Sequence, residues 1–85
     1  MPTISMFYGI IVSMYVNDHN PPHIHTSYQE FHAIYSLTGQ RLEGEMPIRQ
    51  DKLILAWIEI HKEELEADWI LASENKAVYK IEPLK

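Results

Sequence analysis

The spacing of apolar residues changes at Pro47, and this change constrains the fold more than any other feature. Before Pro47, short runs alternate apolar and polar side chains, as half-buried strands do. After it, the stretch from Arg49 to Ser73 contains neither Gly nor Pro, and its apolar residues recur at helical spacing. Strands followed by helix in a chain of 85 residues predict one α+β domain over residues 1–85.

Short turns between the expected strands predict an antiparallel meander. The five expected strands are Thr3 to Tyr8, Ile10 to Val16, His23 to Tyr28, Phe31 to Leu37 and Arg41 to Glu45. Ile10 to Val16 is largely apolar on both sides, which predicts a well-covered strand. A last strand is expected at Ala77 to Ile81, because Asn75 is a suitable helix stop and Pro83 ends the run.

The helical stretch is too long for the molecule. A continuous helix from Arg49 to Ser73 would run about 36 Å, longer than so small a domain is wide. We therefore expect a bend or break near His61, giving one bent helix or two helices packed on one face of the sheet. Trp57 and Trp69 lie roughly 120° apart on an unbroken helix. Either the break brings both rings to the core, or one ring remains available to another chain.

Composition narrows the classes of function. The chain has no cysteine and a net charge of -5, from seven basic and twelve acidic residues. Disulfides and cysteine-bound zinc are therefore excluded, and direct binding of nucleic acid by the chain alone is not expected. Neither a signal peptide nor an apolar run of about 20 residues is present, so we expect a cytoplasmic protein without membrane segments. Small domains are marginally stable, which favours a homo-oligomer or a partner protein.

The stretch Asn17 to His25 is the strongest candidate site. Pro21 and Pro22 make it a stiff elbow, and alternation along the following strand places His23 and His25 on one face. His19 and Asn20 precede the prolines, and the elbow can fold His19 back toward the other two histidines. Three imidazoles with an open position suit Zn²⁺ or another divalent transition metal. Two alternatives stay open: a structural role for the histidines, and metal-free acid–base catalysis or substrate binding.

His61 is a second candidate, because it lies on the apolar stripe of the predicted helix. Glu64 follows it by three residues, a spacing that metal-binding helical bundles use. A core histidine with one hydrogen bond is the alternative. If the protein binds a partner, the residues expected at the interface are Trp57, Leu65, Trp69 and Ile70.

The sequence resembles a small bacterial and archaeal family known as domain of unknown function 4160. The resemblance covers nearly the whole chain, and the combination of its parts is specific. The parts are Met1 to Ile10, Asp18 to His25, Leu42-Glu43-Gly44 before Pro47, Trp57, His61, Glu64-Leu65, Trp69 and Ile81 to Leu84. The resemblance brings no established activity, cofactor or catalytic residue. Genes of that family often neighbour those of another small-domain family, domain of unknown function 2442. The resemblance therefore implies a toxin–antitoxin-like gene pair.

Two functional hypotheses follow. In the first, the protein is a small cytoplasmic partner-binding component of such a gene pair. In the second, it is a metal-dependent hydrolase, a nuclease included, in which His19, His23 and His25 hold the ion and activate water.

Overall fold

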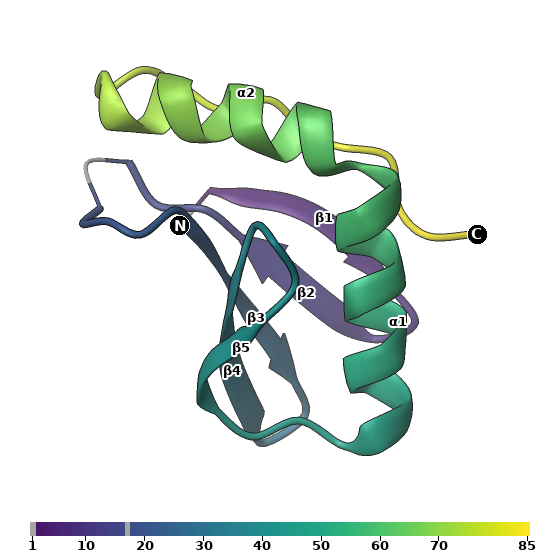
Figure 1. Cartoon of the computed structure of the whole chain (residues 1–85). Helices are drawn as coiled ribbons and strands as arrows, with labels where there is room; N and C mark the ends of the chain where they lie inside the picture. Colours follow the sequence, from purple (N-terminus) through teal and green to yellow (C-terminus); the bar gives the residue numbers. More distant parts are fainter. Residues whose placement is uncertain (1, 17) are drawn as a thin grey trace.

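A computed structural model describes residues 2–16 and 18–85 and contains one five-stranded sheet and two helices (Figure 1). The strands are β1 (Thr3–Phe7), β2 (Ile10–Ser13), β3 (His23–Tyr28), β4 (Phe31–Ser36) and β5 (Arg41–Gly44). They pair in sequence order, each antiparallel to the next. The predicted α+β meander is confirmed.

The register of the sheet sorts its side chains onto two faces. Ile24 of β3 pairs with Tyr35 of β4, and both are fully buried in the core. On the opposite face, a row of paired residues crosses four strands. Its members are Ser13, His25, Ile34 and Glu43. This row joins the strand that carries His23 and His25 to the rest of the face that the helices leave uncovered.

The two helices, α1 (Ile48–Ile60) and α2 (Lys62–Ser73), cover the core face of the sheet. They meet at a corner (Figure 1), where His61 is the one residue between them. The predicted break near His61 is therefore confirmed. It brings both tryptophans inward: Trp57 is 0% exposed, and Trp69 is 9% exposed.

The predicted strand ends at Tyr8, Leu37 and Glu45 are each one residue too late, and the end at Val16 is three residues too late. The second strand ends at Ser13 rather than Val16, because β1 reaches back only to Thr3 and β3 pairs with β2 only as far as Ser13. One further bond, from the Met14 N–H to the carbonyl of Pro2, continues the β1–β2 register by a single residue.

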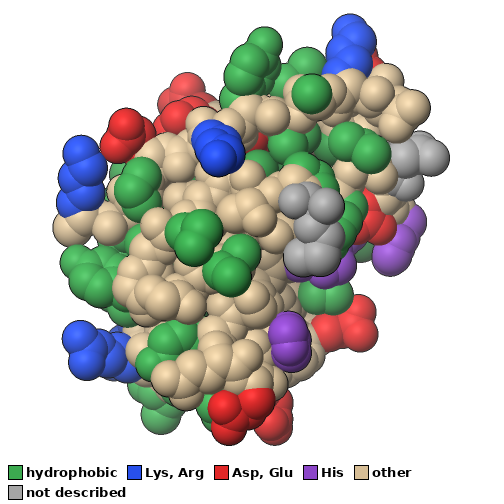
Figure 2. Space-filling view, turned by 180° about the vertical axis from the view of Figure 1, so that it is seen from behind, with side chains coloured by type: hydrophobic (Ala, Val, Ile, Leu, Met, Phe, Trp, Pro, Cys, Tyr) green, Lys and Arg blue, Asp and Glu red, His purple; other side chains and the backbone are tan. Residues whose placement is uncertain are grey.

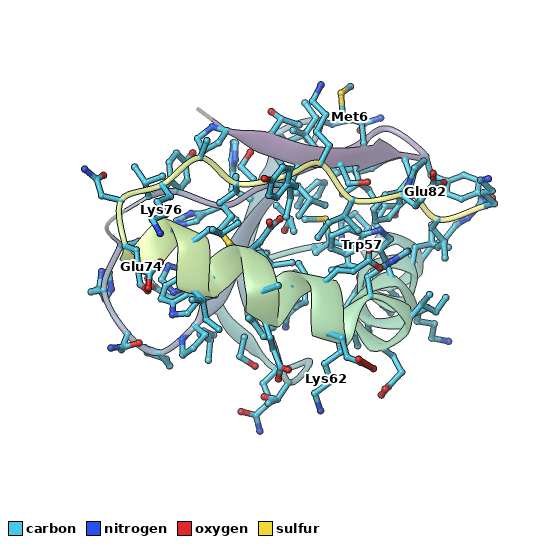
Figure 3. The ribbon with its side chains drawn as sticks, turned by 90° about the horizontal axis from the view of Figure 1, so that it is seen from above. Met6, Trp57, Lys62, Glu74, Lys76 and Glu82 are labelled. Atoms are coloured by element: carbon cyan, nitrogen blue, oxygen red, sulfur yellow. The ribbon has the colours of Figure 1, made fainter. Side chains whose placement is uncertain are left out.

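The last predicted strand, Ala77 to Ile81, is wrong. Residues 77–81 run alongside α2 and β1 (Figure 3) but form no strand. Their N–H groups find different partners: Tyr79 donates to the carboxylate of Asp68, and Ile81 donates to the carbonyl of Ile4. Without successive bonds to one strand, no ladder forms.

The C-terminal segment closes the core between β1 and α2. Trp57 points toward the part of that segment that carries Glu82 (Figure 3), and its Nε1–H donates to the Glu82 carbonyl at 2.8 Å. In the part of the chain that the structure describes, neither helix has the length and apolar character needed to cross a bilayer.

Candidate metal site

The elbow between β2 and β3 brings the candidate ligands together. Its first predicted residue, Asn17, lies outside the described residues. The Asn20–Pro21 peptide bond is cis, and β3 begins directly after Pro22, at His23. As alternation along the strand predicts, His23 and His25 share a face, and their ring centroids lie 5.1 Å apart.

Asp18 completes the cluster. Its Oδ2 atom lies 2.9 Å from Nε2 of His23 and 3.2 Å from Nε2 of His25. Among the described residues, these three form the one group of metal-ligand type whose donor atoms all lie within 4.8 Å of one another. In a tetrahedral site with metal–ligand bonds of about 2.0–2.1 Å, ligand atoms are separated by about 3.3 Å. The two distances from Asp18 to the histidine nitrogens are therefore within a few tenths of an ångström of those that an ion requires.

The contact of His23 with Pro21 defines which ring nitrogen carries a proton. Its Nδ1 lies 2.6 Å from the carbonyl oxygen of Pro21, and a carbonyl only accepts hydrogen bonds. Nδ1 therefore carries the proton, and the Nε2 of a neutral imidazole presents its lone pair to the Asp18 carboxylate. Two acceptors at 2.9 Å repel each other unless a cation lies between them, either a second ring proton or a metal ion. A carbonyl that fixes the ring of a histidine in this way is the usual second partner of a metal ligand.

The carboxylate of Asp18 is held in its charged form. Burial raises its pKa, but the backbone N–H of His19 and the imidazoles of His25 and His23 outweigh burial and lower the pKa to about 2. The His19 N–H donates to Oδ1 at 2.8 Å, which leaves Oδ2 to face the two histidine nitrogens. Asp18 therefore offers an ionised oxygen at any physiological pH.

Packing fixes the two histidines to different degrees. The His23 side chain is only 4% exposed and packs against the ring of Trp69, with centroids 5.3 Å apart. His25 is 32% exposed, and its ring meets that of Tyr15 edge to face at 4.5 Å. The cluster is thus closed on the α2 side and open at His25. A hollow of about 270 Å³ lies there, bordered by His19, His23 and His25 among others. Figure 2 shows histidine side chains on one side of the molecule with acidic side chains nearby.

The remaining predicted ligand, His19, and the candidate residues Asn20 and His61 lie outside this group. The His19 side chain is 86% exposed, and its Nδ1 lies 3.0 Å from the other carboxylate oxygen of Asp18. The third member of the cluster is thus Asp18, and the His19 side chain lies outside it. Asn20 is exposed. His61 bonds to Glu64 at 2.6 Å at the helix corner and packs against Trp57, so it belongs to the contact between the helices.

Asp18 was missed by sequence reasoning for a definable reason. Strand alternation relates His23 to His25, but no periodicity relates either of them to a residue in the preceding turn. A signal was nevertheless present, since Asp18 adds a carboxylate, a common zinc ligand, to a stretch already rich in histidine.

The predicted interface residues are mostly internal. Trp57, Leu65 and Trp69 are buried in the core of the chain, whereas Ile70 is 58% exposed. Ile70 and Trp69 border an apolar groove of about 430 Å³, whose opposite side is formed by Pro21, Pro22 and Leu37.

Comparison with known proteins gives one match. No curated protein and no solved structure matches the chain. A family model described as "Domain of unknown function (DUF4160)" matches residues 9–70. This range includes strands β2 to β5, the whole of α1, and α2 as far as Ile70. The matched part also contains Asp18, His23 and His25. The chain therefore belongs to the DUF4160 family.

Proposed function

We propose that this protein binds a divalent transition metal through Asp18, His23 and His25 and uses it to hydrolyse a small substrate. The observation that carries the proposal is the arrangement of His23, whose Nδ1–H donates to the Pro21 carbonyl while its Nε2 lies 2.9 Å from Oδ2 of Asp18. A divalent metal ion would be held by Nε2 of His23, Oδ2 of Asp18 and Nε2 of His25, with both histidines neutral.

The donor set indicates which metals fit. Two imidazoles and one carboxylate hold Zn²⁺ in several hydrolases and Fe²⁺ in non-haem oxygenases. Three protein ligands leave a coordination position open, and the exposed side of His25 leaves that position accessible. An ion bound there supplies Lewis-acid chemistry and activates water. We therefore expect Zn²⁺ or a similar divalent ion.

Titration of tag-free protein with Zn²⁺, followed by calorimetry and thermal melting, tests the site. One ion per chain should bind, and at a free concentration of 100 times Kd it should stabilise the fold by about 2.7 kcal/mol. Asp18→Asn and His25→Ala should each weaken binding by about 100-fold or more, because each removes a direct ligand. The matched controls, His19→Ala and His61→Ala, should bind Zn²⁺ as the parent does.

Two results would contradict the proposal. One is a melting temperature that Zn²⁺ leaves unchanged, which would leave the cluster as an ion pair between Asp18 and protonated histidine. The other is loss of binding in His19→Ala equal to that in His25→Ala, since the His19 side chain reaches Oδ1 of Asp18 and not the Oδ2 that faces the other two histidines.

A second candidate function is supported by the apolar groove beside Ile70. A small cytoplasmic protein from a toxin–antitoxin-like gene pair would need an apolar surface to bind its partner. The aromatic and aliphatic side chains that line this groove suit such an interface. Ile70→Asp should weaken co-sedimentation with the product of the neighbouring gene by at least about 10-fold. The control is Ile60→Asp, which changes an equally exposed isoleucine on α1. Equal behaviour of the two variants would remove this candidate.

A further inference from the structure

The face of the sheet that the helices leave uncovered contains a second hollow. Its volume is about 470 Å³, and apolar side chains form much of its lining, among them Ile11, Tyr15 and Ile34. Hydroxyl groups of Ser13 and Ser27 lie among them. Because α1 and α2 pack on the opposite face, the described part of the chain places no element over this hollow (Figure 1).

This hollow is continuous with the metal site. His25 belongs to the metal cluster and also borders both the larger hollow and the smaller one beside it. Ile34 and Glu43 are likewise shared by the two hollows. The sheet register explains this, since His25 pairs with Ile34 and Ile34 pairs with Glu43. Glu43 thus lies two strands from His25, a distance of about 10 Å.

The charged side chains that line the two hollows indicate which class of ligand fits them. Among the described residues that line them, none is Lys or Arg, and Glu43 is the one carboxylate. Sites for phosphodiesters normally present basic side chains to the phosphate. A ligand with an apolar body and a positively charged end matches this lining better, because Glu43 can pair with the charge and Ile34 can contact the body.

We propose that the joined hollows bind a small amide or ester that bears an amine, with its carbonyl at the metal, its apolar chain on Ile34 and its amine at Glu43. This inference rests on the metal site proposed above. In the reaction, water adds to the carbonyl carbon, the C–N or C–O bond breaks, and a proton from water passes to the leaving group. The products are a carboxylic acid and an amine or alcohol, and water is the one co-reactant.

Two matched probes test the inference on the Zn²⁺-loaded full chain. 6-Aminohexanehydroxamic acid carries a metal-binding group, an apolar chain and an amine, whereas hexanehydroxamic acid lacks only the amine. The first should bind at least about 10-fold more tightly than the second. Glu43→Gln should abolish this preference and leave Zn²⁺ affinity unchanged. The control, Glu45→Gln, removes a nearby exposed carboxylate that borders neither hollow and should keep the preference.

The outcomes separate this inference from the proposed function. If Zn²⁺ does not bind, the metal site fails and the inference fails with it. If Zn²⁺ binds but Glu43→Gln leaves the amine preference unchanged, or the probes bind alike, the inference alone is overturned. Tighter binding of dimethyl phosphate than of either hydroxamate would overturn the substrate class. A dimer in sedimentation that Ser27→Trp dissociates would overturn it too, by identifying this face as an interface between copies.

Discussion

Tyr35 connects the middle of the sheet to the first turn of α1. Its ring is fully buried, and its hydroxyl donates to Oδ1 of Asp51 at 2.5 Å. Burial of the phenol is the main reason that its pKa lies above the ordinary value of 10.0. The hydrogen bond to Asp51 and its negative charge raise the pKa further, and nearby Arg41 only partly offsets them.

Tyr35→Phe should therefore lower the free energy of unfolding at pH 7 by about 1.5–3 kcal/mol, the usual contribution of a hydrogen bond to a charged group. The effect should depend on pH with a defined sign. Because the folded-state pKa is raised, the folded protein retains a proton that the unfolded chain loses above about pH 10. Parent stability should fall as pH rises beyond that value, and Tyr35→Phe should lack this component.

Urea unfolding at pH 7, 10 and 11 measures the difference between the two proteins. Tyr79→Phe is the matched control, because its ring is 73% exposed and only its backbone N–H takes part in a hydrogen bond within the described residues. A parallel pH dependence in the parent and Tyr35→Phe would show that Tyr35 does not retain the proton.

At the scale of single elements, β5 depends on Gly44. Gly44 has φ +85° and pairs with Ala33 of β4. A Cβ atom added at Gly44 would lie 2.1 Å from the carbonyl oxygen of His32 and 2.8 Å from Cα of Ala33. These are backbone atoms that cannot turn aside, so β5 must move away if position 44 carries a side chain.

Gly44→Ala should therefore destabilise the protein by more than about 3 kcal/mol, or release β5 from the sheet, since strain at positive φ alone costs about 1–2 kcal/mol. Gly39→Ala is the matched control: its φ is +92°, but its added Cβ would meet only Leu55 at 3.9 Å. Urea unfolding and hydrogen exchange of the β5 amides measure both variants. Equal losses in the two would mean that the close backbone approach is not important.

The helices and the C-terminal segment show what sequence patterns can and cannot predict. The break at His61 followed from length alone, because 25 helical residues exceed the width of so small a domain. The five strands followed from alternation and turn residues. Residues 77–81 have strand-like composition, but their structure depends on partners far away in the sequence, Asp68 and Ile4. Composition does not encode such contacts.

The same distinction applies to the candidate site. His23 and His25 could be paired from the two-residue period of a strand, which is a local rule. The position of Asp18 next to the two histidines depends on the path of the elbow. The hydrogen bond from His23 to the Pro21 carbonyl depends on the backbone torsions between them. Neither has a periodic signal. The uncovered face beside His25 emerges only when the register across four strands is known.

At the scale of the whole molecule, the fold is one-sided, and its C-terminal segment completes the covered side. Ile81 is 5% exposed in the core, and its N–H bonds to the Ile4 carbonyl at 2.7 Å. The Nε1–H of Trp57, a core residue, donates to the carbonyl of Glu82, the residue that follows Ile81. The segment thus links β1 to both helices without being part of the sheet.

Ile81→Ala should cost about 2–5 kcal/mol, the usual range when a buried isoleucine is truncated. For a domain of this size, each kcal/mol corresponds to roughly 4–8 °C, so the melting temperature should fall by at least about 8 °C. Tyr79→Ala, an exposed position in the same segment, should change stability by no more than about 0.5 kcal/mol. Thermal melting by circular dichroism compares the two. If Ile81→Ala and Tyr79→Ala melt together, the segment is not part of the core and the helices alone cover the sheet.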